Sequence, residues 1–79
     1  MRCFFVEIKC ALGQTYHVAQ ALDAAEIASE IFSVAGPYDI LAKFYVDDDV
    51  DIGHFVSERV QTLAGVVETR TVLTFKAFK

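Results

Sequence analysis

The chain has 79 residues, of which 54% are hydrophobic, and seven basic against eleven acidic residues give a net charge of −4. This length allows one domain, residues 1–79. No apolar run approaches the roughly 18 residues of a membrane-spanning helix, and the N-terminus lacks the apolar core of a signal peptide. The sequence therefore predicts a cytoplasmic protein with no membrane partner. Scattered basic residues and a negative charge argue against direct binding of nucleic acid.

The first predicted strand covers Cys3 to Cys10 and alternates between two faces. The apolar side consists of Phe4, Val6 and Ile8, and the other side consists of Phe5, Glu7 and Lys9. A strand would separate the two cysteines by roughly 23 Å. A disulfide joins Cα atoms within about 7 Å, so no intrachain bond is expected between them.

A helix and a pair of strands are predicted next. After Gly13, helical spacing is shown by Val18, Ala21, Leu22 and Ala25. Thr15 is the predicted N-cap, and the helix is expected to end near Ala25. The β-branched and aromatic stretch Ile27 to Val34 predicts a second strand, which a tight turn at Gly36-Pro37 joins to a third strand, Asp39 to Val46.

The last third of the chain predicts a second helix and a fourth strand. An acidic residue, Asp49 or Asp51, is expected to cap the helix, and Gly65 is expected to end it. One apolar stripe along this helix is formed by Ile52, Phe55, Val56, Val60 and Leu63. The final strand is predicted over Val66 to Phe78.

The resulting order, β-α-β-β-α-β, predicts an α+β ferredoxin-like fold, with a four-stranded antiparallel sheet and two helices on one face. The open face would carry apolar side chains among charged ones: Phe5, Leu41, Tyr45 and Val72 beside Glu7, Glu30, Lys43 and Arg70. A second copy of the sheet is the expected cover, because apolar patches of this kind mark interaction sites. The sequence therefore predicts a homodimer in the form of a dimeric α/β barrel.

One acidic stretch resembles a calcium-binding loop only in part. Asp47, Asp49, Asp51 and Glu58 fall at positions 1, 3, 5 and 12 of such a loop. Position 6 must be glycine, but Ile52 occupies it, and a strand is predicted before the loop instead of a helix. We expect a solvated, helix-capping loop without a metal ion.

Catalytic motifs are absent from the sequence. His17 and His54 each lie at the start of a predicted helix, and neither has a cysteine or a paired carboxylate at ligand spacing. No nucleophile elbow and no glycine-rich phosphate loop is present, so no cofactor is expected. A small dimeric barrel enzyme that uses His17 or His54 on a hydrophobic substrate remains an alternative by analogy of fold.

The stretch "AGPYDIL" allows two interpretations. As a turn, Gly36 supplies an unusual φ, Pro37 fixes the next one, and Asp39 bonds the local backbone. As a site, the carboxylate of Asp39 would accept the ammonium group of a small amino acid.

The segments "VAGPYDILAKF" and "LAGVVETRTVLTF" together resemble the effector-binding domain of the Lrp/AsnC family, also called the RAM domain, over the whole chain. Gly36, Tyr38 and Asp39 match the family's G-x-Y/F-D turn. The entry to the last strand, G-V-x-x-T-x-T, is matched by Gly65, Val66, Thr69 and Thr71.

The resemblance implies a dimer formed sheet to sheet, further association into tetramers, octamers or rings, and an amino-acid effector bound between dimers. The ligand-binding residues it implies are Gly36, Tyr38, Asp39, Val72 and Thr74. Pro37 departs from the expected site, because it lacks an amide that would otherwise meet the ligand carboxylate.

Family members typically carry an N-terminal helix-turn-helix that binds DNA, and this chain lacks it. The expectation is a stand-alone regulatory module that co-assembles with full-length relatives in transcription regulation or modulates an enzyme. A purely structural oligomerisation domain with an empty turn is the remaining alternative.

Overall fold

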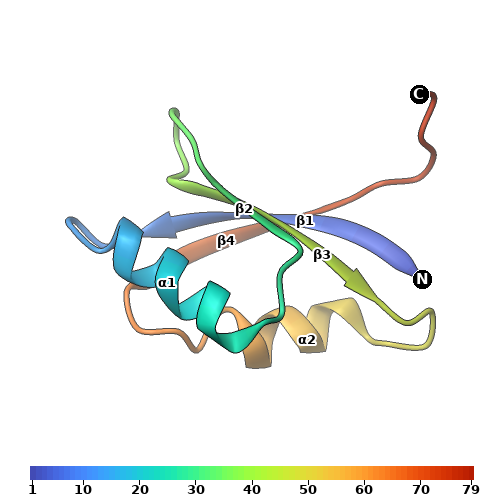
Figure 1. The fold of residues 1–79 in the computed structure, drawn as a ribbon, viewed down its shortest axis with the longest axis horizontal. Helices are drawn as coiled ribbons and strands as arrows, with labels where there is room; N and C mark the ends of the chain where they lie inside the picture. The colour runs from blue at the N-terminus through green and yellow to red at the C-terminus, as the bar shows by residue number, and fades with distance from the viewer.

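The computed structural model describes residues 1–79 and has the predicted element order. The strands are β1 (Arg2–Cys10), β2 (Glu30–Ser33), β3 (Ile40–Val46) and β4 (Val66–Leu73), and the helices are α1 (Thr15–Ala25) and α2 (Ile52–Arg59). The strands form one antiparallel sheet in the order β2-β3-β1-β4, and both helices cover the same face of it (Figure 1). The predicted ferredoxin-like fold is confirmed. Neither helix is long and apolar enough to cross a membrane.

The core lies between the helices and one face of the sheet, and every one of its 13 buried residues is apolar. Strand alternation produces it directly, because Phe4 and Phe44 project from paired positions of β1 and β3 on the helix side. The rings of Phe4 and Phe44 stack with centroids 5.2 Å apart, and Phe55 of α2 meets both edge-on. The other faces of the same strands are left for solvent or for a partner.

The open face of the sheet carries the predicted mixture of apolar and charged groups. Lys43 lies between Phe5 and Tyr45, with its Nζ 5.9 Å and 5.2 Å from their ring centroids. Arg70 Nε pairs with Glu7 Oε1 across β4 and β1 at 2.6 Å. Tyr45 is 46% exposed, although it is a large aromatic side chain on a central strand.

Two predicted helix boundaries were wrong. Thr15 is the first residue of α1, whereas Gln14 holds the N-cap position without a side-chain cap bond. Helix α2 ends at Arg59 instead of continuing to Gly65. The side chain of Val60, which follows, is fully buried, and a series of turns after it directs the chain back to β4.

Gly65 has a different role from the predicted helix cap. Its φ is +96°, and a Cβ at this position would lie 3.0 Å from Val18 Cγ2 and 3.1 Å from Gln14 Cβ. Its carbonyl oxygen accepts a 2.8 Å hydrogen bond from the amide of Ala11. Glycine therefore allows the start of β4 to approach the start of α1 closely.

The predicted ends of the edge strands were also wrong. β4 stops at Leu73 instead of Phe78, because Leu73 pairs with Phe4 and β1 has almost no residues left to pair beyond that point. β2 begins at Glu30 instead of Ile27, and Ile27 packs on the core from the preceding loop. The link from β2 to β3 is longer than the tight turn expected, since it runs over residues 34–39.

Candidate functional site

Asp39 ends the link between β2 and β3 and ties it to the end of β1. Its amide donates to the carbonyl oxygen of Ile8 at 2.9 Å, and its Oδ2 accepts from the amide of Cys10 at 2.8 Å. The side chain of Asp39 therefore bonds an amide 29 residues away in the sequence, whereas its carbonyl oxygen bonds within the turn, where it accepts from the amide of Val34 at 3.0 Å. A backbone donor at an irregular point of the β1–β4 register, between Lys9 and Cys10, is satisfied in this way.

The half-buried carboxylate of Asp39 lines a cleft of about 360 Å³. The other lining residues come from the end of β1, the loop to α1, the start of α1 and β4: Lys9, Cys10, Ala11, Leu12, Gly13, Thr15 and Val67. This volume falls within the usual range for small-molecule sites. The sequence did not point to the loop from Ala11 to Gly13, because its place beside Asp39 depends on the register of β1 with β3.

The start of α1 contributes to the charge distribution of this cleft. Thr15, the first helical residue, lines the cleft, and no side chain caps the amides of the first turn. A helix N-terminus carries partial positive charge and unpaired N–H groups. The cleft therefore combines a carboxylate, Asp39, with the positive end of a helix, and these are complementary to the ammonium and the carboxylate of one amino acid.

The surroundings of Cys10 raise its pKa and so favour the neutral thiol. Burial raises the pKa of the Cys10 thiol, and the negative charge of Asp39 raises it further, while a hydrogen bond with Thr15 opposes both effects. Nucleophilic cysteines need the opposite, a lowered pKa beside positive charge. The other cysteine, Cys3, is also a free thiol, near the opposite end of β1.

Tyr38 points toward the open face and fixes the turn from that side. Its hydroxyl donates to Glu68 Oε2 at 3.0 Å, and the guanidinium carbon of Arg70 lies 5.8 Å from its ring centroid. The hydrogen bond to Glu68 is the main cause of the raised pKa of Tyr38, followed by desolvation. Gly36, with φ at +112°, has open space where a Cβ would stand, so its role in the turn is conformational.

Val72 and Thr74 lie at the other end of β1 from Asp39. Val72 is paired with Phe5 on the open face, and the Thr74 hydroxyl donates to the carbonyl of Cys3 at 3.3 Å. The structure thus brings Gly36, Tyr38 and Asp39 together in one connection and keeps Val72 and Thr74 apart from them. A single site that uses all five residues needs more than one chain.

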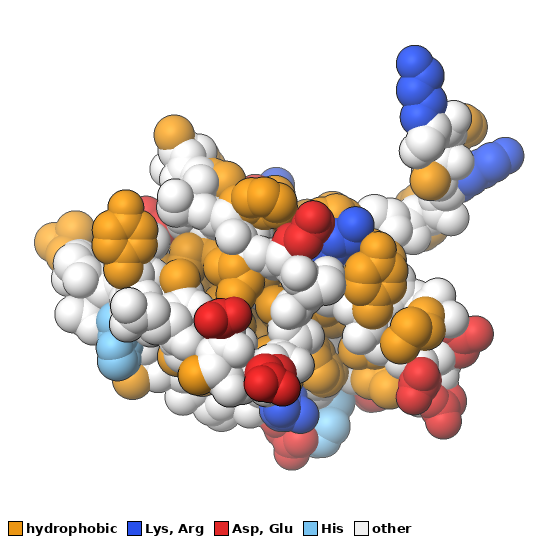
Figure 2. Space-filling view, in the orientation of Figure 1, with side chains coloured by type: hydrophobic (Ala, Val, Ile, Leu, Met, Phe, Trp, Pro, Cys, Tyr) orange, Lys and Arg blue, Asp and Glu red, His pale blue; other side chains and the backbone are white.

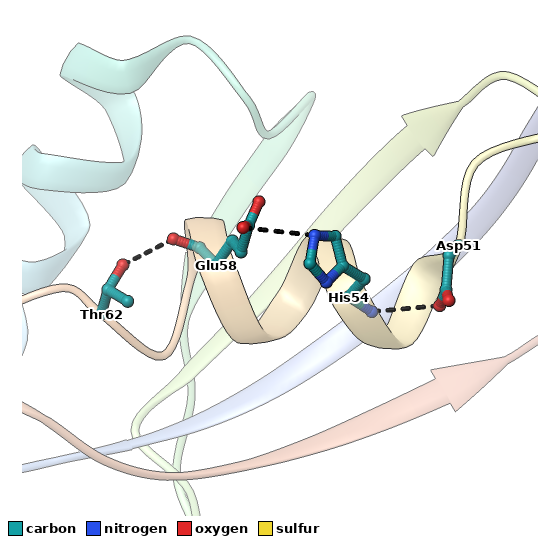
Figure 3. A network of polar contacts seen from close by, with 4 residues as sticks. All are labelled: Asp51, His54, Glu58 and Thr62. Atoms are coloured by element: carbon teal, nitrogen blue, oxygen red, sulfur yellow. Dashed lines mark hydrogen bonds and ion pairs between the residues drawn. The ribbon is translucent and has the colours of Figure 1, made fainter.

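His54 lies in the first turn of α2, and the acidic stretch supplies the N-cap of this helix (Figure 3). Asp51 is the N-cap, as predicted, and its Oδ1 accepts from the amide of His54 at 3.1 Å. His54 does have a carboxylate partner, contrary to the sequence interpretation, because Glu58 Oε1 lies 3.2 Å from its Nε2 one turn along the helix. No group of three or more His, Cys, Asp and Glu side chains is placed to hold a metal ion.

Comparison with known proteins identifies both a family and close structural neighbours. The model of the Lrp/AsnC ligand binding domain matches residues 3–79. TTHA0845 from Thermus thermophilus superposes with a TM-score of 0.88 and 29% identity, over 100% of this chain and 99% of that one.

Two longer proteins share the fold at lower identity. E. coli AsnC has a TM-score of 0.87 and 17% identity, and the match covers 98% of this chain and 52% of AsnC. The Neisseria meningitidis transcriptional regulator NMB0573, solved as a complex with L-Met, has a TM-score of 0.85 and 18% identity, over 99% of this chain and 52% of that protein. A search of curated proteins finds no match.

Proposed function

Since this chain belongs to the Lrp/AsnC ligand-binding domain family, we propose that it is a regulatory module that self-associates and binds a small amino acid as its effector. The observation that carries the proposal is the position of Asp39. Within the family-like turn, its carboxylate lines a cleft that also contains the uncapped start of α1. A zwitterionic ligand matches this pair of charges.

In the proposed complex, the effector ammonium approaches Asp39 Oδ1, while Oδ2 keeps its bond to Cys10. The effector carboxylate is received by backbone amides of the first turn of α1, of the turn at residues 36–39 or of a neighbouring subunit. Val72 and Thr74 of another chain then contact the effector side chain, which places the site between dimers. The apolar surplus and the open sheet face support self-association.

Known structures support both the ligand class and the autonomy of the module. The Neisseria regulator was solved with L-Met, a small amino acid. TTHA0845 consists almost entirely of this domain, which supports a module that works without an attached DNA-binding half. We propose that the module acts on transcription by co-assembling with full-length Lrp/AsnC relatives, or that it modulates a metabolic enzyme.

Isothermal titration calorimetry with each of the twenty amino acids tests this function. We expect at least one to bind with saturable heat, and light scattering of the same sample should show a stabilised or larger assembly. If none binds at millimolar concentration while the protein is folded and oligomeric, the chain is a structural oligomerisation domain and the proposal is wrong.

A further inference from the structure

The strand β4 forms one free edge of the sheet. It pairs with β1 alone, so the backbone N–H and C=O groups on its outer side have no strand partner. Most of its side chains are exposed, and Val67 is 62% exposed. The chain after β4 does not fold back over this edge, because residues 74–79 stand away from the body of the protein (Figure 1 and Figure 2).

The sequence of β4 favours the addition of another strand. VVETRTVL contains no proline and no lysine, which usually protect a free edge, and five of its eight residues are β-branched. The register with β1 shifts at the start of β4, but Glu68 to Leu73 pair with β1 without a break. The other edge strand, β2, has only four residues. The outer side of β4 is therefore the longer edge open to strand pairing.

Two opposite charges flank Thr69 on this strand. Glu68 and Arg70 both lie on the open face of the sheet, two residues apart. The Glu68 carboxylate accepts the hydroxyl of Tyr38 through Oε2, at 3.0 Å. Arg70 pairs with Glu7 through its Nε. Oε1 of Glu68 and the terminal nitrogens of Arg70 are left for a further ionic partner.

These charges restrict how β4 can pair with β4 of a second copy. Directly opposite residues of an antiparallel pair share one face, so two-fold symmetry requires one residue to lie opposite its own copy. With Thr69 in that position, Glu68 of each chain lies opposite Arg70 of the other. Centring the pair on Arg70 or on Glu68 sets like charges opposite each other, which destabilises a sheet. Centring it on Val67 or Thr71 leaves both charges opposite uncharged residues. Charge complementarity therefore selects the register centred on Thr69.

We propose that β4 of one copy pairs antiparallel with β4 of a second copy, in the register centred on Thr69, so that the two sheets become continuous. Two ion pairs between Glu68 and Arg70 form on the open face. Thr69 pairs with the buried Ile8 of β1 and so lies on the helix face, where the two Thr69 side chains meet. Opposite-charge pairs and Thr–Thr pairs both stabilise neighbouring strands. This contact uses the edge of the sheet and the proposed sheet-to-sheet dimer uses its open face, so either can form without the other.

Disulfide formation tests the register. In a background of Cys3→Ser and Cys10→Ala, Thr69→Cys places two thiols directly opposite each other, at a separation that a disulfide spans. Thr71→Cys is the matched control on the same strand and face, because its two thiols would lie about 13 Å apart along the strands. Under mild oxidation, we expect the Thr69→Cys chain to form a cross-linked dimer about tenfold faster than the Thr71→Cys chain. Equal rates would overturn the proposal.

A charge exchange within the Thr69→Cys chain gives an independent measurement. Glu68→Arg alone sets guanidinium groups opposite each other, and Arg70→Glu alone does the same with carboxylates, so each variant should cross-link about tenfold more slowly. A mixture of the two variants, carrying different tags, restores opposite charges at both positions. The mixed disulfide should therefore form about as fast as in the Thr69→Cys chain.

A mixed disulfide that forms no faster than the disulfide of either variant alone would contradict the pairing. Circular dichroism of each variant confirms that it is folded, and the comparison of Thr69→Cys with Thr71→Cys does not depend on the charge variants. If both tests fail while the protein binds an amino acid, the β4 contact is wrong and the proposed function stands.

Discussion

Asp39 is both a structural and a candidate ligand-binding residue. Its Oδ2 holds the amide of Cys10, which secures the end of β1 beside the start of β3. The same carboxyl group lines the cleft next to α1. A substitution at this position can separate the two roles if it retains the acceptor for Cys10 and removes the negative charge.

Asp39→Asn makes that separation. The side-chain amide oxygen can still accept from Cys10, so we expect little change in the thermal midpoint. Loss of a charge-assisted hydrogen bond to the effector ammonium should weaken binding by about 1.5 to 3 kcal/mol, roughly ten- to a hundredfold. Calorimetry with the amino acid found in the screen measures the affinity.

Asp47→Asn is the matched control, because Asp47 is an exposed acid at the other end of β3. It changes the net charge equally and should leave affinity unaltered. If Asp39→Asn lowered thermal stability markedly and affinity stayed the same, the turn at residues 36–39 would have a structural role and would not bind the effector.

Sequence alone predicted the faces of single residues well and their long-range partners poorly. Phe4 and Phe5 were assigned to opposite faces correctly, because the period of two is fixed by strand geometry. Gly36, Tyr38 and Asp39 lie together because they are nearly contiguous. The bond from Cys10 to Asp39 depends on strand register, which no local pattern near either residue encodes.

At the scale of elements, boundaries that depend on local contacts were predicted better than boundaries that depend on packing between distant parts of the chain. The N-cap of α2 was predicted because Asp51 bonds an amide only three residues away. The end of α2 was not, because it is set by the burial of Val60 and by the path back to β4. The length of β4 was likewise set by where β1 begins, at the other end of the chain.

Asp51→Ala should destabilise the fold by about 1 kcal/mol, the usual cost of losing an N-cap. The affected bond is the one that His54 donates to the Asp51 side chain. Urea denaturation followed by circular dichroism measures the free energy of unfolding. Asp49→Ala, in the same acidic loop but with no cap bond, should change it by less than about 0.5 kcal/mol. Equal losses of unfolding free energy in the two variants would contradict the role of Asp51 as the N-cap of α2.

Gly65→Ala, at the junction of α1 and β4, should lower the free energy of unfolding by more than the strain of an alanine at positive φ accounts for. The added Cβ would press against Val18 and Gln14 at about the limit of contact. Gly36→Ala is the control, since its φ is also positive but no atom lies within 4 Å of the added Cβ. We expect the first variant to lose about 1 to 3 kcal/mol more than the second in urea denaturation, the cost of overpacking.

At the scale of the whole molecule, the core is small and lies on one side. Only 13 of the 79 residues are buried, and all of them lie between the helices and one face of the sheet. Phe32, at 47% exposed, and Tyr45 remain accessible on the other side of the sheet. This distribution accounts for the apolar surplus in the composition, and it is the physical basis for the proposed sheet-to-sheet dimer. The dimer itself stays a prediction.

Tyr45→Asp should raise the dimer dissociation constant at least tenfold, because it places an unpaired charge in the proposed interface. Tyr16→Asp is the matched control, since Tyr16 is an exposed tyrosine on α1, away from the open face. Sedimentation equilibrium over a range of concentrations measures both constants. An unchanged constant for Tyr45→Asp would mean that Tyr45 does not face the partner sheet.

The position of β1 in the sheet also has a kinetic consequence. β1 precedes the other three strands in the sequence, yet it is a central strand, and its neighbours β3 and β4 come later in the sequence. Pairing between Phe4 and Leu73 closes a loop of nearly the whole chain. Such non-local pairing slows folding relative to helical proteins of the same size. During synthesis, both edges of β1 therefore stay unpaired until later strands leave the ribosome, and its apolar residues are exposed to chaperones or to other nascent chains.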